Sequence, residues 1–554
     1  MIERPALTPL TPLQRLLAEQ QDMTAVERFS LHHDAASDAG GKTYREMIPL
    51  RAPQAGQQYA FEVDLDLCTG CKACVTGCHN LNGLDDGEIW RTVGLLHGGT
   101  ATRPAQQTVT TACHHCLEPA CLAGCPVKAY EKDPVTGIVK HLDDQCIGCQ
   151  YCVFMCPYDA PKFNPARGIV RKCDMCSDRL ANDEAPACVQ SCPNEAIRIT
   201  VVDRADAIEA SLANVFLPGA PGPADTLPTT VYKTARALPH NMLPADFYTV
   251  SPEHAHLPLV VMLTLTQLSV GAFVLNLAAQ RLMGAAAGRA LSVGNALSAL
   301  FFGLAAMAAS TLHLGRPLYG FRAILGLRTS WLSREILGFS LFAGLATVYA
   351  AAFRITAIPR AWHAALGTTT AAVGIAAVAC SVMVYAATRR PHWRASVTGP
   401  KFFATTVILG AATVLMVSTL MTATGAGNGV GNGAEMFAGS GAFGLLAKLL
   451  IATASIKLGA ELAVLRHLKD QQHSTGKRAA ILLTRDLAVP ARLRFACGLA
   501  GGVALPAAAL ASTSLGVLTI LSVGIFLLSL AGELLERSFF FSTAPASKMP
   551  GGLE

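Results

Sequence analysis

The sequence predicts a chain of two parts, an α+β cysteine-rich domain followed by an all-α membrane domain of eight transmembrane helices. Of the 554 residues, 51% are hydrophobic and only 15% are charged, which is too apolar for an ordinary soluble protein. Residues 1–256 contain 21 Lys and Arg against 30 Asp and Glu, whereas the remainder contains 23 against 8. Sixteen of the 18 cysteines lie between Cys68 and Cys192. The first part is therefore acidic and rich in thiols, and the second is basic and apolar.

The first 57 residues form an N-terminal extension that we expect to be partly helical. Apolar residues recur at helical spacing, from Leu10 and Leu13 to Val26 and Phe29, which is typical of an amphipathic helix. The extension has no basic segment followed by an apolar run and no twin-arginine pair. We therefore expect no export signal.

The cysteines of residues 58–203 fall into four groups of four. The first and third groups have the spacing C-x2-C-x2-C-x3-C, and the last three groups each end in Cys-Pro. This spacing wraps three thiolates around one 4Fe-4S cubane and sends the fourth to a neighbouring cubane. Zinc prefers two separated C-x2-C pairs and a disulfide framework requires export, so we expect a ferredoxin-like domain with four 4Fe-4S clusters. The expected ligands are Cys68, Cys71, Cys74, Cys78, Cys113, Cys116, Cys121, Cys125, Cys146, Cys149, Cys152, Cys156, Cys173, Cys176, Cys188 and Cys192.

Two pairings of the four cysteine groups are compatible with this rule. In the nested pairing, the first group shares two clusters with the last, and the second group shares two with the third. In the sequential pairing, the first group shares two clusters with the second, and the third group shares two with the fourth. In either case, four cubanes in one domain predict an electron-transfer chain rather than a catalytic centre.

Histidines and basic residues near the cysteines need another explanation than cluster ligation. Each group already has four thiols, so we expect His79, His114 and His115 to tune the clusters from outside or to lie at the surface. The basic stretch from Lys162 to Lys172 belongs to an acidic domain without interleaved aromatic residues. It therefore predicts counter-charge for anionic clusters or a docking face, and nucleic acid is not an expected partner.

Residues 204–256 are rich in Pro, Gly and Ala and predict an extended linker. The remaining segment, 257–554, contains apolar stretches that are each long enough to span a bilayer, which takes roughly 20 residues. We expect eight transmembrane helices, near residues 257–279, 290–314, 331–353, 363–387, 401–423, 439–465, 493–511 and 515–536.

The distribution of basic residues predicts the orientation of these helices. Loops on the side of the N-terminus contain 17 Lys and Arg, whereas the opposite loops contain only four. Lys and Arg are retained on the cytoplasmic side. We therefore expect a multi-pass protein of the bacterial cytoplasmic membrane, with its cysteine-rich domain in the cytoplasm.

Ionisable residues inside membrane spans usually mark a function. His313 at the end of the second span and Glu335 in the third come to the same membrane face as the cysteine-rich domain. A quinone needs an apolar slot and groups that hydrogen-bond its oxygens and exchange protons, and a histidine with a carboxylate can do both. We therefore expect His313 and Glu335 to bind and protonate ubiquinone or menaquinone. The competing interpretation is an interfacial ion pair between Arg334 and Glu335.

Other charged residues in the spans predict structural roles or leave two possibilities. Glu533 and Arg537 in the last span are expected to form an ion pair. Lys448 and Lys457 in the sixth span could form a proton path or pair with Glu461. The sequence does not decide between these two possibilities.

A b-type haem requires two axial ligands on one membrane face. His313 and His363 lie at span ends, but the predicted topology places them on opposite faces. We therefore expect no haem.

Four segments resemble a known family. One is the run Cys113-His114-His115-Cys116-Leu117-Glu118-Pro119-Ala120-Cys121, and the others are 310–317 (STLHLGRP), 330–336 (SWLSREI) and 532–537 (GELLER). From about residue 58 onward, the sequence is similar to the iron-sulfur subunit and the eight-helix membrane anchor of dimethyl sulfoxide reductase-type molybdoenzymes, fused into one chain. This resemblance implies quinol binding by His313 and Glu335, and it favours the nested pairing of clusters.

The resemblance also implies a partner. This chain has no pterin-binding domain, so a separate molybdopterin-containing catalytic subunit is expected to bind the substrate. The best-known family members work outside the cytoplasm, whereas the charge pattern here points inward. The chain is thus similar to the cytoplasm-facing branch that includes sulfite-oxidising molybdoenzymes, and sulfite is the favoured substrate over dimethyl sulfoxide or another small sulfur compound or oxyanion.

Two other function classes stay open at this point. The chain could be a redox-coupled ion-pumping module with a different catalytic partner, which only Lys448 and Lys457 support. It could also be a self-contained enzyme that reduces a small substrate at its own clusters. No open ligand position supports that second possibility.

Overall fold

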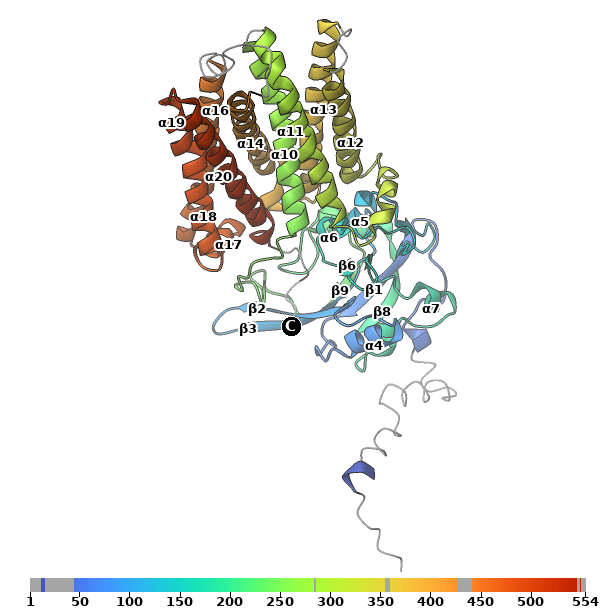
Figure 1. Cartoon of the computed structure of the whole chain (residues 1–554). Coiled ribbons are helices and arrows are strands. Elements are labelled where there is room, and N and C mark those ends of the chain that lie inside the picture. The colour runs from blue at the N-terminus through green and yellow to red at the C-terminus, as the bar shows by residue number, and fades with distance from the viewer. Residues whose placement is uncertain are drawn as a thin grey trace, which may run out of the picture.

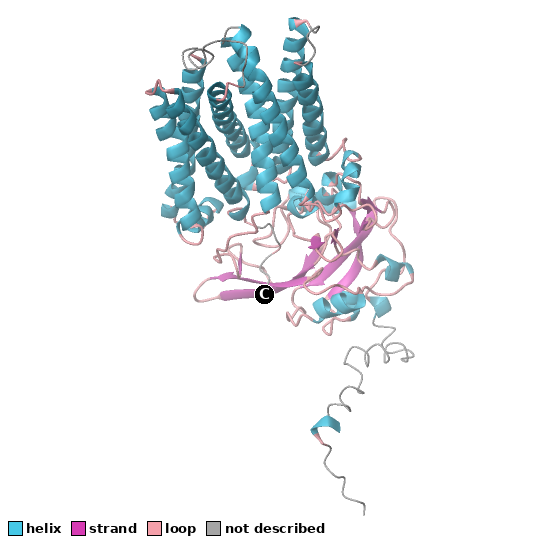
Figure 2. Ribbon diagram, viewed as in Figure 1, coloured by secondary structure: helices cyan, strands magenta, loops and turns pink. Residues whose placement is uncertain are grey.

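The computed structural model describes residues 11–14, 44–282, 285–353, 359–425, 441–545 and 549. It consists of a bundle of long helices that stands on a smaller domain of sheets and short helices (Figure 1). All the strands lie in the smaller domain (Figure 2). The predicted fold class is therefore confirmed. Most of the expected N-terminal amphipathic helix lies outside the described residues.

Two three-stranded sheets and two hairpins form the framework of the cysteine-rich domain. Strand β1 pairs antiparallel with β8, and β2 pairs antiparallel with β3. The hairpins β4-β5 and β6-β7 lie between the second and fourth cysteine groups in sequence. The strands are β1 (Gln57–Asp64), β2 (Thr92–Gly99), β3 (Pro104–Thr111), β4 (Tyr130–Lys132), β5 (Val139–His141), β6 (Lys162–Asn164), β7 (Ile169–Arg171) and β8 (Ile197–Asp203).

Short helices follow the cysteine loops and carry part of each cysteine group. Because β1 precedes the first group and β8 follows the last, their pairing brings the two ends of the cysteine-rich segment together. The helices are α4 (Ala73–Leu81), α5 (Ala120–Gly124), α6 (Tyr151–Met155), α7 (Ser177–Ala181) and α8 (Ala187–Gln190).

The segment 204–256 is not the extended linker that its composition predicted. It begins with helix α9 (Arg204–Leu212), and after the short helix η1 (Pro223–Asp225) it adds two strands to the sheets. Strand β9 (Val231–Lys233) pairs parallel with β1, and β10 (Leu243–Pro244) pairs with β2. Propensity was overruled by tertiary contacts here, because the edges of β1 and β2 offer unpaired backbone groups to any strand that reaches them.

Eight helices of the described residues are long and apolar enough to cross a membrane, as expected. The seventh is one continuous rod with a π-helical turn in its middle, η5 (Ala500–Ala504). The spans are α10 (Leu257–Leu282), α11 (Ala285–Thr311), α12 (Trp331–Ala352), α13 (Arg360–Ala386), α14 (Ala395–Ala423), α16 (Ala442–Ala463), α18 (Ala488–Leu499) continued by α19 (Leu505–Leu510), and α20 (Leu515–Ser542).

Helix α10 lies at the centre of the bundle and packs against α11, α13, α14 and α20. Its closest approach is to α14, where a Cβ atom on Gly271 would lie 1.9 Å from the carbonyl oxygen of Thr406. Only glycine allows two backbones to meet so closely, as in many membrane helix pairs. This crossing fixes the middle of the bundle.

The cysteine-rich domain is docked on one end of the bundle by backbone contacts. The Gly326 amide donates to the Pro126 carbonyl at 2.7 Å, and the Arg316 amide donates to the Ile147 carbonyl at 3.1 Å. The Tyr151 hydroxyl of α6 donates to the Val384 carbonyl of α13 at 2.7 Å. The two parts thus share one continuous interface.

Candidate functional site

Thiols from distant parts of the sequence meet in the cysteine-rich domain. Cys74 of the first group interacts electrostatically with Cys192 of the last, and Cys78 interacts with Cys188. The neighbouring thiols form four sets, namely Cys68, Cys74 and Cys192; Cys78, Cys173, Cys176 and Cys188; Cys113, Cys116, Cys121 and Cys156; and Cys125, Cys146, Cys149 and Cys152. This arrangement agrees with the nested pairing and not with the sequential one. Cys71 is exposed and joins the first set by sequence only.

The sets follow one another through the domain. Cys188 of the second set interacts with Cys74 of the first, and Cys173 of the second set interacts with Cys113 of the third. The buried Tyr130 interacts with thiols of both the third and the fourth sets. The fourth set lies next to the membrane helices, because it shares a hydrophobic core with residues 314, 323 and 336.

The thiols fit iron-sulfur clusters by three observations. All sixteen are free, and a cavity is lined by the four thiols of the third set, Cys113, Cys116, Cys121 and Cys156.

Two buried cations among the thiols, Arg91 and Lys172, are the third observation. The sequence did not point to Arg91. Arg91 is 2% exposed, and its Nε and Nη2 have no hydrogen-bond partner among the described residues. Burial opposes its charge, but nearby thiols, Cys188 first, raise the pKa of Arg91 above its usual value. Lys172 is equally buried and interacts with Cys113 and Cys121. Buried unpaired cations are costly, so these two residues fit anionic groups bound to the thiols.

His114 and His115 are buried rather than exposed. The Nδ1 of His114 lies 2.8 Å from the Thr230 hydroxyl, and the Nδ1 of His115 accepts from the Val139 amide at 3.0 Å. Burial lowers the pKa of both rings, that of His114 to about 3. Both imidazoles are therefore neutral and hydrogen-bonded beside the thiols.

The rest of the basic stretch is paired inside the domain. Arg167 and Arg171 form ion pairs with Asp85 and Glu88. The counter-charge interpretation therefore holds for Lys172 alone, and these two arginines do not form a free docking face.

His313 lies at the junction of the two domains, beside the fourth thiol set. It interacts with the backbone of Cys149, and burial lowers the pKa of His313 to about 4. Its ring meets that of His256 at a centroid distance of 5.5 Å, and His256 meets His254 at 4.7 Å. Sequence analysis missed both of these histidines, because they were assigned to a linker.

This histidine contact bears on the expected absence of haem. The sequence places His313 and His363 at span ends on opposite faces, but His256 directly precedes α10 and lies on the same face as His313. The absence of haem stays a prediction.

Glu335 of α12 is 3% exposed and lies in the bundle. It accepts a hydrogen bond from the Ser381 hydroxyl of α13, and it interacts electrostatically with Tyr151 and Tyr385. Tyr151, which interacts with Glu335, lies two residues after Cys149 in the sequence, and Cys149 is the residue that His313 contacts. The structure thus brings His313 and Glu335 to the same cysteine loop, without a direct contact between them.

The structure tests the ion pairs that the sequence offered in the spans, either as an expectation or as an alternative. Arg334 donates to the Leu327 and Arg328 carbonyls, so it is not paired with Glu335. Lys457 contacts Glu533 and Glu536 rather than Glu461. Pairing across helices replaced pairing along one helix, because α16, α18 and α20 pack side by side.

Glu461 pairs with Arg494, at 2.8 and 3.0 Å, so the alternative of a lysine paired with Glu461 is not observed. The expected pair of Glu533 with Arg537 is not observed either, because Arg537 pairs with Glu536, at 3.7 Å. Lys448 is exposed on the bundle surface.

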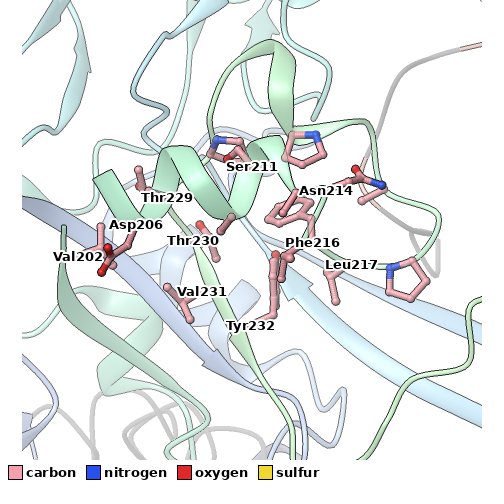
Figure 3. Close-up of a pocket in the computed structure, with 18 of the residues that line it drawn as sticks. Val202, Asp206, Ser211, Asn214, Phe216, Leu217, Thr229, Thr230, Val231 and Tyr232 are labelled. Atoms are coloured by element: carbon pink, nitrogen blue, oxygen red, sulfur yellow. The ribbon is translucent and has the colours of Figure 1, made fainter. Parts of the chain in front are cut away.

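A separate surface pocket of about 980 Å³ lies between α9 and β9. Figure 3 shows Phe216, Leu217 and Tyr232 at one end of this pocket and Val202 and Asp206 at the other. None of the described residues that line it is a cysteine. It is therefore distinct from the thiol sets.

Comparison with known protein families identifies both parts. The family described as the DMSO reductase anchor subunit (DmsC) matches residues 252–543, which is more than half of the sequence. The protein belongs to the DmsC family. A 4Fe-4S dicluster domain matches residues 105–202, so this member of the DmsC family has an iron-sulfur domain fused to its anchor. The resemblance seen in the sequence is confirmed.

The iron-sulfur part of this DmsC-family protein is similar to curated subunits. It is 37% identical to the B subunit of the anaerobic dimethyl sulfoxide reductase of Escherichia coli over 166 residues, which are 28% of this chain and 80% of that protein. It is 34% identical to the corresponding B subunit of Haemophilus influenzae over 26% of this chain and 76% of that protein. It is 35% identical to the formate dehydrogenase iron-sulfur subunit of Haemophilus influenzae over 26% of this chain and 54% of that protein.

These findings establish the general role. The chain is an electron-transfer iron-sulfur subunit joined to a DmsC-type membrane anchor of the DMSO reductase family, and it is a multi-pass membrane protein. The first cysteine group, Cys68 to Cys78, lies outside the 4Fe-4S dicluster match.

Proposed function

We propose that this protein passes electrons between the membrane quinone pool and a separate molybdopterin-containing catalytic subunit, through four 4Fe-4S clusters bound by the sixteen cysteines. The observation that carries the proposal is the order of the thiol sets, of which the fourth adjoins the membrane helices next to His313 and Glu335. The first set lies at the far end of this series. Each cluster would accept a single electron. The fold of the protein sets the order in which the clusters follow one another.

The cluster number has a direct chemical test. We expect anaerobically purified protein to contain about 16 iron and 16 sulfide per chain and no haem absorbance. Iron and sulfide assays with a reduced-minus-oxidised spectrum measure both. An iron content near eight would show that two of the four thiol sets bind no cluster, and a b-type spectrum would contradict the absence of haem.

The proposed quinone contacts are His313 and Glu335. His313 is neutral at pH 7 because burial lowers its pKa, so one ring nitrogen accepts and the other donates a hydrogen bond. Its Nε2 is buried and has no hydrogen-bond partner among the described residues, and we propose that it hydrogen-bonds a quinone oxygen. Glu335 is held by Ser381 and would give or take a proton as the quinone gains or loses two electrons.

The proposed orientation places the cluster domain in the cytoplasm of a bacterium. It is supported by the 17 to four asymmetry of basic residues. Protease added to intact spheroplasts should leave the cluster domain untouched, whereas the same protease should remove it from inverted membrane vesicles. Immunoblotting measures both results. Cleavage in spheroplasts alone would reverse the orientation.

The proposed catalytic partner binds at the far end of the cluster series. Two of the curated relatives carry the name of a dimethyl sulfoxide reductase and a third that of a formate dehydrogenase, which supports a molybdoenzyme partner here. A cytoplasmic location favours sulfite as the substrate over dimethyl sulfoxide. Affinity purification of the tagged protein should recover a large molybdenum-containing protein, and metal analysis measures this. Recovery of a flavoprotein or a hydrogenase instead would overturn the proposed partner.

A further inference from the structure

A second group of buried charges lies in the membrane bundle, apart from His313 and Glu335. Glu533 and Glu536 of α20 are 1% and 3% exposed. Lys457 of α16 donates to Glu533 and lies 3.3 Å from Glu536. Arg494 of α18 lies 3.0 Å from Glu533. We call these residues, with Arg537, Glu461 and Lys401, the ion network.

A neutral hydroxyl lies in the middle of the ion network. Thr405 of α14 donates to Glu533 at 2.6 Å and accepts from Lys457 at 2.7 Å and from Arg537 at 3.3 Å. Carboxylate, ammonium and hydroxyl groups are thus within hydrogen-bond reach of one another across three helices. Such an arrangement can move a proton in short steps.

The ion network reaches the protein surface near the end of the bundle that adjoins the cluster domain. Lys401 lies 3.7 Å from Glu536, and its side chain is 35% exposed. Glu461, on the other edge, pairs with Arg494 and is 13% exposed. The remaining members are almost completely buried, so these two residues are the exits from the network.

Toward the interior, the ion network ends in unpaired donors. Arg537 is 0% exposed, and its Nε and Nη1 have no hydrogen-bond partner among the described residues. Its Nη2 donates to Gln267 of α10 at 2.9 Å, and the Nε2 of Gln267 is also unpaired. Buried polar atoms without a protein partner normally bind water.

One tyrosine connects the unpaired donors with Glu335. Tyr385 of α13 interacts electrostatically with both Glu335 and Arg537. Its ring packs on Phe402 and Phe540, and the Arg537 guanidinium lies over the same two rings. Tyr385 therefore shares its two ring contacts with Arg537 and interacts electrostatically with Glu335.

We propose that the ion network is the proton route between the cluster-side surface and the quinone site, with Tyr385 as the link to Glu335. This inference rests on the proposed quinone reaction. A quinone that takes two electrons from the reduced clusters also takes two protons, one on each oxygen, and quinol oxidation releases the same two. The route supplies or removes these protons on the face that carries the clusters.

A purely structural role explains the network less well. Buried ion pairs are often replaceable by apolar side chains without loss of stability, and ionisable groups inside membrane spans are costly. Packing alone would not require two partly exposed residues at one end and unpaired donors at the other. These features are those of a path.

The test uses the full-length protein with its clusters, reconstituted in lipid vesicles and reduced with dithionite. Stopped-flow absorbance follows cluster reoxidation by decylubiquinone, which takes protons, and by ferricyanide, which takes none. The variants are Lys457→Gln and Tyr385→Phe. Lys448→Gln is the matched control, because it removes an exposed lysine of the same helix that lies outside the network.

We expect Lys457→Gln and Tyr385→Phe to slow reoxidation by the quinone at least about tenfold, as for a lost proton transfer. Reoxidation by ferricyanide, the quinone concentration for half-maximal rate and the iron content should stay as in wild type. Quinone rates equal to wild type in Tyr385→Phe, which keeps the ring and removes only the hydroxyl, would overturn the proposal. Wild-type protein that reduces no quinone would instead overturn the proposed function.

Discussion

Electron exchange with a quinol analogue should fall at least about tenfold in both His313→Ala and Glu335→Gln, while all clusters assemble. His313 contacts the backbone of Cys149, and Glu335 lies beside Tyr151. Loss of either side chain would remove a proposed hydrogen-bond or proton-exchange partner of the quinone without touching a thiol. Stopped-flow reduction of the clusters by quinol measures the effect.

His363→Ala is the matched control for these variants. His363 lies near the start of α13, at the end of the bundle away from the cluster domain, so this substitution should leave the quinol rate unchanged. Reduction by dithionite should be normal in all three variants, because it bypasses the membrane. Unchanged quinol kinetics in both site variants would make His313 and Glu335 structural residues of the junction.

The second large effect is expected from Gly315→Ala, at the contact between the two domains. A Cβ atom on Gly315 would lie 2.1 Å from the carbonyl oxygen of Gly168 and 2.5 Å from its carbonyl carbon. Both atoms belong to a backbone, so neither can rotate away. We expect the variant to be less stable by about 1–3 kcal/mol, as for other overpacked sites, and to exchange electrons with quinol more slowly.

Thermal unfolding followed by cluster absorbance, together with quinol kinetics, measures both effects of Gly315→Ala. Gly344→Ala in α12 is the control, since an added Cβ there meets nothing within 4 Å and alanine favours a helix over glycine. Wild-type stability and wild-type quinol kinetics in Gly315→Ala would show that the interface adapts to an added methyl group.

The elements that the sequence predicts well are those with local causes. Cysteine spacing is set by the reach of a single loop, and a membrane span is set by the length of an apolar run, so the four cysteine groups and the eight spans were both visible. The cysteine group that pairs with the first group was not visible in the sequence, because loop spacing allows two pairings. The β1-β8 contact, which brings the first and last groups together, distinguishes them.

Long-range polar contacts were the part that sequence analysis could not reach. Glu533 and Arg537 are one helical turn apart and predicted a pair, but Lys457 and Arg494 from neighbouring helices contact Glu533 instead. Nothing in the sequence distinguishes Arg91 from the other arginines. Only its burial in the structure shows that it lies among the thiols. His256 could have been noticed, since it directly precedes an apolar run.

The connection between the two domains has a consequence for assembly. Its strands β9 and β10 join the cluster domain, and its last residues meet the bundle, where the Glu253 amide donates to the Ser542 carbonyl at 2.9 Å. A covalent tether raises the effective concentration of one partner at the other to about the millimolar range when it is short, and this one is largely ordered in advance. The membrane anchor and the iron-sulfur domain are therefore made in equal amounts and do not separate on dilution, so every copy of the protein is a complete membrane module.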